Sequence, residues 1–319
     1  MKKIIGLFAL MLTLNGCDDG DITIEEIDFE DVTAVYCEQN NLLYKIKDNE
    51  ALLIQIKNPD TYFTHNVSNE GVPTSINIDN TDNRVIYRAY SGEVATGNIC
   101  ATIPLSTPSV TEEWVATSGT IEITTTANVV PNTTSTAGNA TKITGYTYYI
   151  EFKNVTFLKP NGVEQLYETY VFGDRIINST LPFAFNIDDV QQCPTTNEVH
   201  NHSGKESLVL NLDSSFFTGT TGTNKKVISA TNKVTYKLFE TALSASYFCT
   251  SPFPASPILS EEWNGVDGVI GVSGEIEVIT TEVAPDFEYT IHLKKVTLKR
   301  GNAEFYLGDD YIYGTFIGD

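Results

Sequence analysis

The chain has 319 residues, of which 41% are hydrophobic and 19% charged, a globular composition that excludes a disordered or fibrous protein. Its length predicts about two domains. The formal net charge of −21 argues against a nucleic-acid partner, because phosphate binding needs clustered Lys and Arg. With 16 Tyr, 16 Phe and only 2 Met, the composition favours strands over helices.

The N-terminus carries the features of an export signal. Lys2 and Lys3 precede an apolar run from Ile4 to Leu14, which is typical of a secretory signal peptide and too short for a membrane span. The following Asn15, Gly16 and Cys17, together with Leu14, resemble the lipobox of bacterial lipoproteins. In that family the chain is cut before the cysteine, which then carries acyl chains such as palmitate. The resemblance predicts a signal peptide over residues 1–16 and lipidation of Cys17; an ordinary signal peptide beside an unrelated cysteine is the alternative.

An acidic segment follows the predicted cleavage point. Residues 17–30 contain Asp18, Asp19, Asp21, Glu25 and Glu26, and we expect them to form an acidic tether. The cluster resembles the surface-export signal of Bacteroidota lipoproteins, which implies an outer-membrane, cell-surface location held by the lipid anchor. In proteobacteria an Asp after the cysteine would instead retain the protein at the inner membrane. A tether without a sorting role, on a protein facing the periplasm, is the remaining alternative.

The rest of the chain contains an internal duplication. Matching pairs of segments are 52–56 with 208–212, 83–88 with 232–237, 112–114 with 261–263, 118–123 with 273–278, and 148–158 with 289–299. They divide the chain into a first repeat over residues 31–178 and a second over residues 188–319. The connector, residues 179–187, contains Pro182, Phe183 and Phe185, and we expect it to pack between the repeats.

Apolar residues alternate along both repeats, as in strands with one buried face. Leu52, Ile54 and Ile56 alternate in the first repeat, and their counterparts at 208, 210 and 212 do so in the second. The alternation slips by one residue at 153–154 and again at 294–295, which predicts a β-bulge or corner in each repeat. We predict an all-β fold after the signal peptide: two tandem homologous antiparallel β-sandwich or barrel-like domains of six to eight strands each.

The cysteines fit a disulfide framework. Without Cys17 four remain, and only one of their three pairings respects the repeat: Cys37 with Cys100 and Cys193 with Cys249. No C-x-x-C occurs, so we expect neither a metal site nor a cofactor. His200 and His202 could lie on one strand face as a metal fragment, but they lack a third ligand nearby in sequence, which favours solvated loop histidines. Residues 79–83 could hold calcium, and a polar turn explains them equally well.

Each repeat also carries a Glu-Glu-Trp segment, at 112–114 and 261–263. Paired carboxylates suggest a glycosidase, but neighbours in a strand point to opposite faces. We interpret Trp114, Trp263, Glu113, Glu262, Gly119 and Gly274 as repeated structural residues, with each Trp a buried plug. Exposed Trp platforms for stacking on sugars are the alternative.

No sequence motif assigns a reaction. We expect a non-enzymatic surface lipoprotein whose two β-domains bind an extracellular ligand, most naturally a glycan. Two alternatives stay open: a structural spacer or component of an envelope-protein complex, and a hydrolase whose acidic residues are scattered through the sequence. An exposed aromatic row would favour glycans, an apolar patch a protein partner, and a cleft with convergent acids an enzyme.

Overall fold

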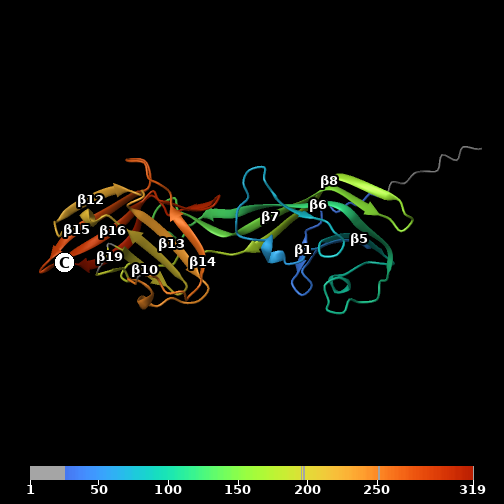
Figure 1. Cartoon of the computed structure of the whole chain (residues 1–319), viewed down its shortest axis with the longest axis horizontal. Helices are drawn as coiled ribbons and strands as arrows, with labels where there is room; N and C mark the ends of the chain where they lie inside the picture. The colour runs from blue at the N-terminus through green and yellow to red at the C-terminus, as the bar shows by residue number, and fades with distance from the viewer. Residues whose placement is uncertain (1–25, 195, 197, 251, 319) are drawn as a thin grey trace, which may run out of the picture.

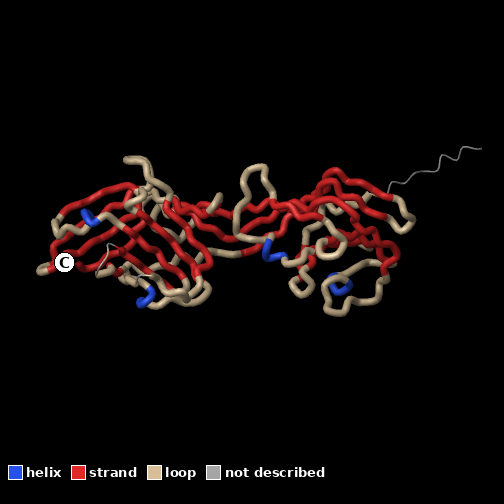
Figure 2. Tube along the Cα trace, in the orientation of Figure 1, coloured by secondary structure: helices blue, strands red, loops and turns tan. Residues whose placement is uncertain are grey.

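The computed structural model describes residues 26–318 except 195, 197 and 251. The signal peptide, Cys17 and most of the predicted tether lie outside the described residues. The described chain is mostly strand (Figure 2), with 53% strand and 4% helix, in antiparallel sheets of which one is curled into a half-barrel. This confirms the predicted all-β, sandwich-like class. Among the described residues, no helix has the length and apolar character needed to cross a bilayer.

The first repeat forms a single antiparallel sheet. Its order is β1-β2-β3-β5-β6-β7-β8, with β4 beside β6. The strands are β1 (Val35–Cys37), β2 (Leu42–Lys47), β3 (Glu50–Gln55), β4 (Thr74–Asn77), β5 (Arg84–Tyr90), β6 (Val110–Pro131), β7 (Thr141–Leu158) and β8 (Glu164–Asn178).

The second repeat forms two sheets, ordered β18-β17-β14-β13-β11-β10-β9 and β12-β15-β16-β19. The strands are β9 (Gln191–Gln192), β10 (Glu198–Ser203), β11 (Glu206–Asn211), β12 (Gly222–Val227), β13 (Lys233–Phe239), β14 (Leu259–Gly265), β15 (Glu275–Val283), β16 (Asp286–Lys294), β17 (Thr297–Arg300), β18 (Ala303–Tyr306) and β19 (Tyr311–Gly318).

The strand orders of the two repeats correspond. Strands β9, β10, β11, β12 and β13 take the places of β1 to β5, and the long strands β6, β7 and β8 are each split in two in the second repeat. The split falls at the corner that the sequence predicted: Asn154 in β7 and Lys295 between β16 and β17 both have positive φ, 50° and 51°. The same chain path is therefore one continuous sheet in the first repeat and two sheets in the second.

Glycine is required at this corner in β6 of the first repeat and just before β15 of the second. A Cβ on Gly119, whose φ is +116°, would lie 2.7 Å from the Val155 Cα. A Cβ on Gly274, whose φ is +65°, would lie 2.6 Å from the Gly268 Cα. Real Cβ atoms do not approach backbone so closely, so both positions need glycine for space as well as for conformation.

Buried residues of both repeats form one continuous hydrophobic cluster. Figure 1 shows the repeats as two lobes of an elongated molecule, with the β6–β7 hairpin reaching from the first lobe to the second. The division into two tandem domains therefore stays a prediction.

The first repeat begins earlier than the sequence suggested. Ile27 and Phe29, which we assigned to the acidic tether, are buried against the first repeat. The Ile27 amide donates to the Tyr167 hydroxyl at 3.0 Å, and the buried Lys45 ammonium donates to the Phe29 carbonyl at 2.9 Å. Two apolar residues within the predicted acidic tether therefore pack against the first repeat.

Candidate functional site

The loop between β6 and β7, residues 132–140, joins the two repeats. Its tip contacts the β18–β19 corner, where the Asp309 amide donates to the Gly138 carbonyl at 2.9 Å. The Asn139 side-chain amide also donates to the Asp309 carboxylate at 2.7 Å. In the second repeat the corresponding strands, β15 and β16, are joined by Ala284 and Pro285 alone. The bridging loop is therefore specific to the first repeat.

The connector between the repeats is held by one buried carboxylate. Glu206 is 2% exposed and accepts the backbone N–H groups of Phe183 and Ala184 at 2.8 and 2.7 Å. It also accepts the Tyr236 hydroxyl at 2.8 Å. Burial raises the pKa of Glu206 despite these hydrogen bonds. The Phe183 ring packs against Tyr236, Phe305 and Tyr311, so the connector is packed, as we expected.

A cavity of about 370 Å³ lies where the bridging loop, the connector and the β18–β19 corner meet. This volume lies within the range of small-ligand sites in proteins. Its aromatic walls include Phe185, Phe305, Tyr306 and Tyr311. The bridging loop adds polar side chains, Asn132, Thr134, Ser135 and Thr136. We name this space the junction cavity.

Charge is sparse in the junction cavity. Of the described residues that line it, Lys142 alone carries a charge, and none is an Asp, Glu, His or Cys. A glycosidase needs two carboxyl groups flanking the scissile bond. The lining instead combines aromatic faces with neutral hydrogen-bonding groups, an arrangement suited to holding a ligand.

The two tryptophans are buried plugs, as the sequence predicted, with exposed fractions of 1% for Trp114 and 0% for Trp263. Each indole N–H donates to the glutamate two residues earlier: to Glu112 at 2.6 Å and to Glu261 at 3.0 Å. The Lys159 ammonium lies 3.9 Å from the centroid of the Trp114 ring, a cation–π contact. Neither indole is available as a platform for sugars.

The second glutamate of each segment points to the opposite face of the sheet. Glu113 pairs with Arg88 at 2.7 Å and Glu262 with Lys237 at 3.7 Å, and in both repeats the partners are opposite residues of neighbouring strands. The four glutamates therefore make structural contacts, and the two carboxylates of each pair lie on opposite faces of the sheet.

Glu261 also joins the two repeats. Its carboxylate shares a hydrogen bond of 2.7 Å with the His65 Nδ1, and His65 stacks on Tyr146 with ring centroids 4.3 Å apart. Burial raises the pKa of Glu261, but hydrogen bonds from His65 and Trp263 outweigh it and leave the pKa below its ordinary value. Sequence reasoning missed this contact, because His65 lies outside the segments that repeat.

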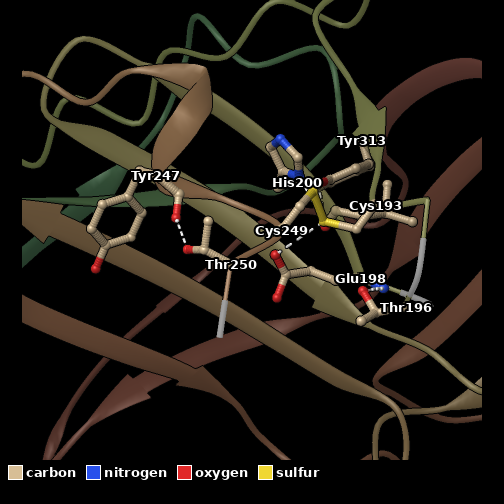
Figure 3. Close-up of a disulfide and its surroundings, with 9 residues drawn as sticks. Cys193, Thr196, Glu198, His200, Tyr247, Cys249, Thr250 and Tyr313 are labelled. Carbon is tan, nitrogen blue, oxygen red and sulfur yellow. Dashed lines mark hydrogen bonds between the residues drawn. A yellow bond between two sulfur atoms is a disulfide. The ribbon is translucent and has the colours of Figure 1, made fainter. Parts of the chain in front are cut away.

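Both predicted disulfides are present, Cys37–Cys100 and Cys193–Cys249. The second disulfide lies beside two ionisable side chains, His200 and Glu198 (Figure 3). His200 Nδ1 lies 3.8 Å from Cys193 Sγ, and Glu198 Oε1 lies 3.5 Å from the same sulfur. His200 also stacks on Phe248 with ring centroids 4.2 Å apart.

The expectation of solvated loop histidines was wrong for His200. This residue lies on β10 and is 2% exposed, because the segment between β13 and β14 covers that face of the strand. His202 follows on the same strand and is half-buried. The sequence could not reveal the cover, since Phe248 lies 48 positions further along the chain.

Replacing His200 by tyrosine, the residue at the equivalent position 44, should remove an acid-dependent loss of stability. Burial lowers the pKa of His200 to about 4 from an unfolded value of 6.5. Between these pH values the unfolded chain binds a proton that the folded chain does not, so stability falls as the pH falls. We expect the free energy of unfolding to drop between pH 7 and pH 4 by up to about 3 kcal/mol more in the unaltered chain than in His200→Tyr. Urea denaturation at both pH values measures this, and equal losses in the two proteins would contradict it.

The acidic segment 79–83 is a polar turn. Asp79 Oδ1 accepts the backbone N–H groups of Thr81, Asp82 and Asn83 at 2.9, 2.8 and 2.9 Å. Hydrogen bonds from these backbone groups lower the pKa of Asp79 to about 2. One carboxylate oxygen of Asp79 is thus engaged by backbone groups of the turn itself.

Comparisons with protein-family models, curated proteins and solved structures identify no relative of this chain. No family model matches the chain, and the curated proteins and solved structures give no significant match.

Proposed function

We propose that this protein is a non-enzymatic, lipid-anchored cell-surface protein that binds an extracellular glycan in the junction cavity. The observation that carries the proposal is the cavity itself, about 370 Å³ bounded by three chain segments at the meeting point of the repeats. Such interfaces are preferred positions for ligand sites. The bridging loop is specific to the first repeat, so duplication produced two related halves and the added loop completes one site between them.

The chemistry of the lining supports a sugar as the ligand. Aromatic rings such as Phe185 and Tyr306 offer apolar faces against which a pyranose ring can stack. Hydroxyl and amide groups of the bridging loop, including Thr134 and Asn132, can hydrogen-bond sugar hydroxyls. Lys142 adds one cation, which favours a neutral or acidic sugar over a basic one.

A binding role is also supported over hydrolysis. The carboxylates that suggested a glycosidase hold indoles, cross-strand cations and the inter-repeat contact to His65. None of them lines the junction cavity.

Replacing Phe185 by alanine should weaken glycan binding at least about tenfold, since it removes an aromatic face from the cavity wall. The test uses the full chain carrying Cys17→Ser, screened on a glycan array, with calorimetry on the glycans that bind. Tyr149→Ala is the matched control, because Tyr149 is an exposed aromatic of β7 outside the cavity lining. Failure of the unaltered chain to bind any glycan, or equal weakening by both variants, would overturn the proposed site.

The anchor is tested separately at Cys17. Cys17→Ser should abolish metabolic labelling by a fatty-acid analogue, because it removes the sulfur that the lipobox resemblance assigns to the acyl group. The labelled protein is detected after membrane fractionation, with Cys37→Ser as the control for another cysteine of the same chain. Unchanged labelling of Cys17→Ser would contradict the lipoprotein assignment.

A further inference from the structure

Equivalent strand positions in the two repeats carry side chains of different chemical character. In the first repeat, β2 presents Leu42, Tyr44 and Ile46, which pack around the Cys37–Cys100 disulfide in an apolar satellite core. In the second repeat, the pairing of β10 with β11 matches that of β2 with β3, and β10 presents Glu198, His200 and His202. A face that is apolar in one copy therefore carries a carboxylate and two imidazoles in the other.

Stacking on Phe248 accounts for the ring of His200 but not for its two polar nitrogen atoms. The side chain is 98% removed from solvent, and its Nε2 has no hydrogen-bond partner among the described residues. Its one polar contact given by the structure is Nδ1 to Cys193 Sγ, at 3.8 Å. Burying an unpaired polar group costs free energy, and the tyrosine of the first repeat fills the equivalent position without an imidazole. The position of the imidazole therefore suggests that its role involves the Cys193 sulfur.

Three potential metal ligands converge here. Cys193 Sγ, Cys249 Sγ and His200 Nδ1 belong to the one group of His, Cys, Asp or Glu among the described residues whose ligand atoms all lie within 4.8 Å of one another. Two thiolates and one imidazole are a ligand set that zinc uses, with bond lengths that place sulfur and nitrogen ligands about 3.5 Å apart. The Cys193–His200 distance already has nearly this value. Cys249 is exposed, so reductants and ions can reach the site, and Glu198 lies beside it (Figure 3).

We propose that the Cys193–Cys249 disulfide is a redox-gated metal site, which binds a thiophilic divalent cation such as Zn²⁺ through Cys193, Cys249 and His200 once the bond is reduced. A dithiol reductant gives two electrons and two protons to the disulfide: the S–S bond breaks, two thiols form, and the reductant becomes its own disulfide. The cation then displaces the two thiol protons, forms two metal–sulfur bonds and takes the lone pair of the His200 Nδ1. A fourth position is left for a water molecule. The site is separate from the junction cavity and does not depend on the proposed function.

Cobalt titration tests the proposal on the full chain carrying Cys17→Ser. The protein is reduced with dithiothreitol, freed of reductant by anaerobic gel filtration, checked by circular dichroism and titrated with Co²⁺. We expect one equivalent to give the thiolate-to-Co²⁺ charge-transfer band, and Zn²⁺ to displace it. The oxidised chain should give no band. His200→Tyr should weaken Co²⁺ binding at least about tenfold.

The first repeat provides the matched control. Removing its disulfide with Cys37→Ser and Cys100→Ser should leave the Co²⁺ band unchanged, whereas Cys193→Ser with Cys249→Ser should abolish it. The proposal is overturned if the reduced chain loses its strand signal, if it gives no band, if His200→Tyr binds Co²⁺ as tightly as the unaltered chain, or if the band depends on Cys37 and Cys100.

Discussion

Replacing Trp263 by alanine should lower the free energy of unfolding by about 3–5 kcal/mol, the range typical of deleting a large buried aromatic ring. Trp263 is fully buried and packs edge-on against Phe305, with ring centroids 5.4 Å apart. Its loss leaves a cavity that the surrounding residues fill only in part. It also removes the indole donor of Glu261, a buried carboxylate that then keeps its contacts to His65 and Arg300.

Trp114→Ala is the matched comparison and should cost somewhat less. Its glutamate partner, Glu112, is only half-buried and can be solvated when the indole is lost. Urea unfolding followed by circular dichroism measures both variants, and intrinsic fluorescence of the remaining tryptophan reports on the other repeat. A cost below about 1 kcal/mol for Trp263→Ala would contradict its role as a core plug.

Removing the Cys37–Cys100 disulfide, with both cysteines replaced by serine, should lower the free energy of unfolding by about 4 kcal/mol in the chain-entropy account. The bond closes a loop of 63 residues, which the unfolded chain would otherwise explore freely. Its sulfurs lie in the apolar satellite core of the first repeat, so the serine hydroxyls add a further desolvation cost.

The Cys193–Cys249 bond closes a similar loop of 56 residues, so its removal should have a comparable entropic effect. The same denaturation experiment on Cys193→Ser with Cys249→Ser checks this. Non-reducing peptide mapping of the unaltered chain verifies the pairing in solution. Four free thiols, or a bond between the repeats, would contradict the framework on which both predictions depend.

Several details of the fold could be predicted because they depend on short stretches of chain that occur twice. The slip of alternation at Lys153-Asn154 and Lys294-Lys295 marked the corner where both repeats take positive φ at Asn154 and Lys295. The equivalent spacing of the cysteines selected the correct pairing among three. The position of each Trp within an alternating strand identified it as a buried residue.

The candidate site could not be predicted in the same way. The junction cavity is made by a bridging loop, a connector and a strand corner that are far apart in sequence. The sequence of the loop is rich in Asn, Thr and Ser, as in ordinary polar connections, and its role depends on the Asp309 region that it reaches. The burial of Ile27 and Phe29 was likewise not predictable from an acidic segment, because it depends on contacts to β2 and β8.

The sequence by itself determined the all-β class, the duplication, the corners, the disulfide pairing and the burial of the tryptophans. These features follow from the period of two along strands and from comparison of the two repeats. A feature that occurs in both repeats is distinguished in this way from one that occurs in a single repeat by chance. Tertiary structure alone decided which segments enclose the junction cavity, that Glu261 meets His65, and that His200 is buried against a disulfide. Those contacts depend on how unrepeated loops pack across the chain, and packing between distant segments leaves no periodic mark in the sequence.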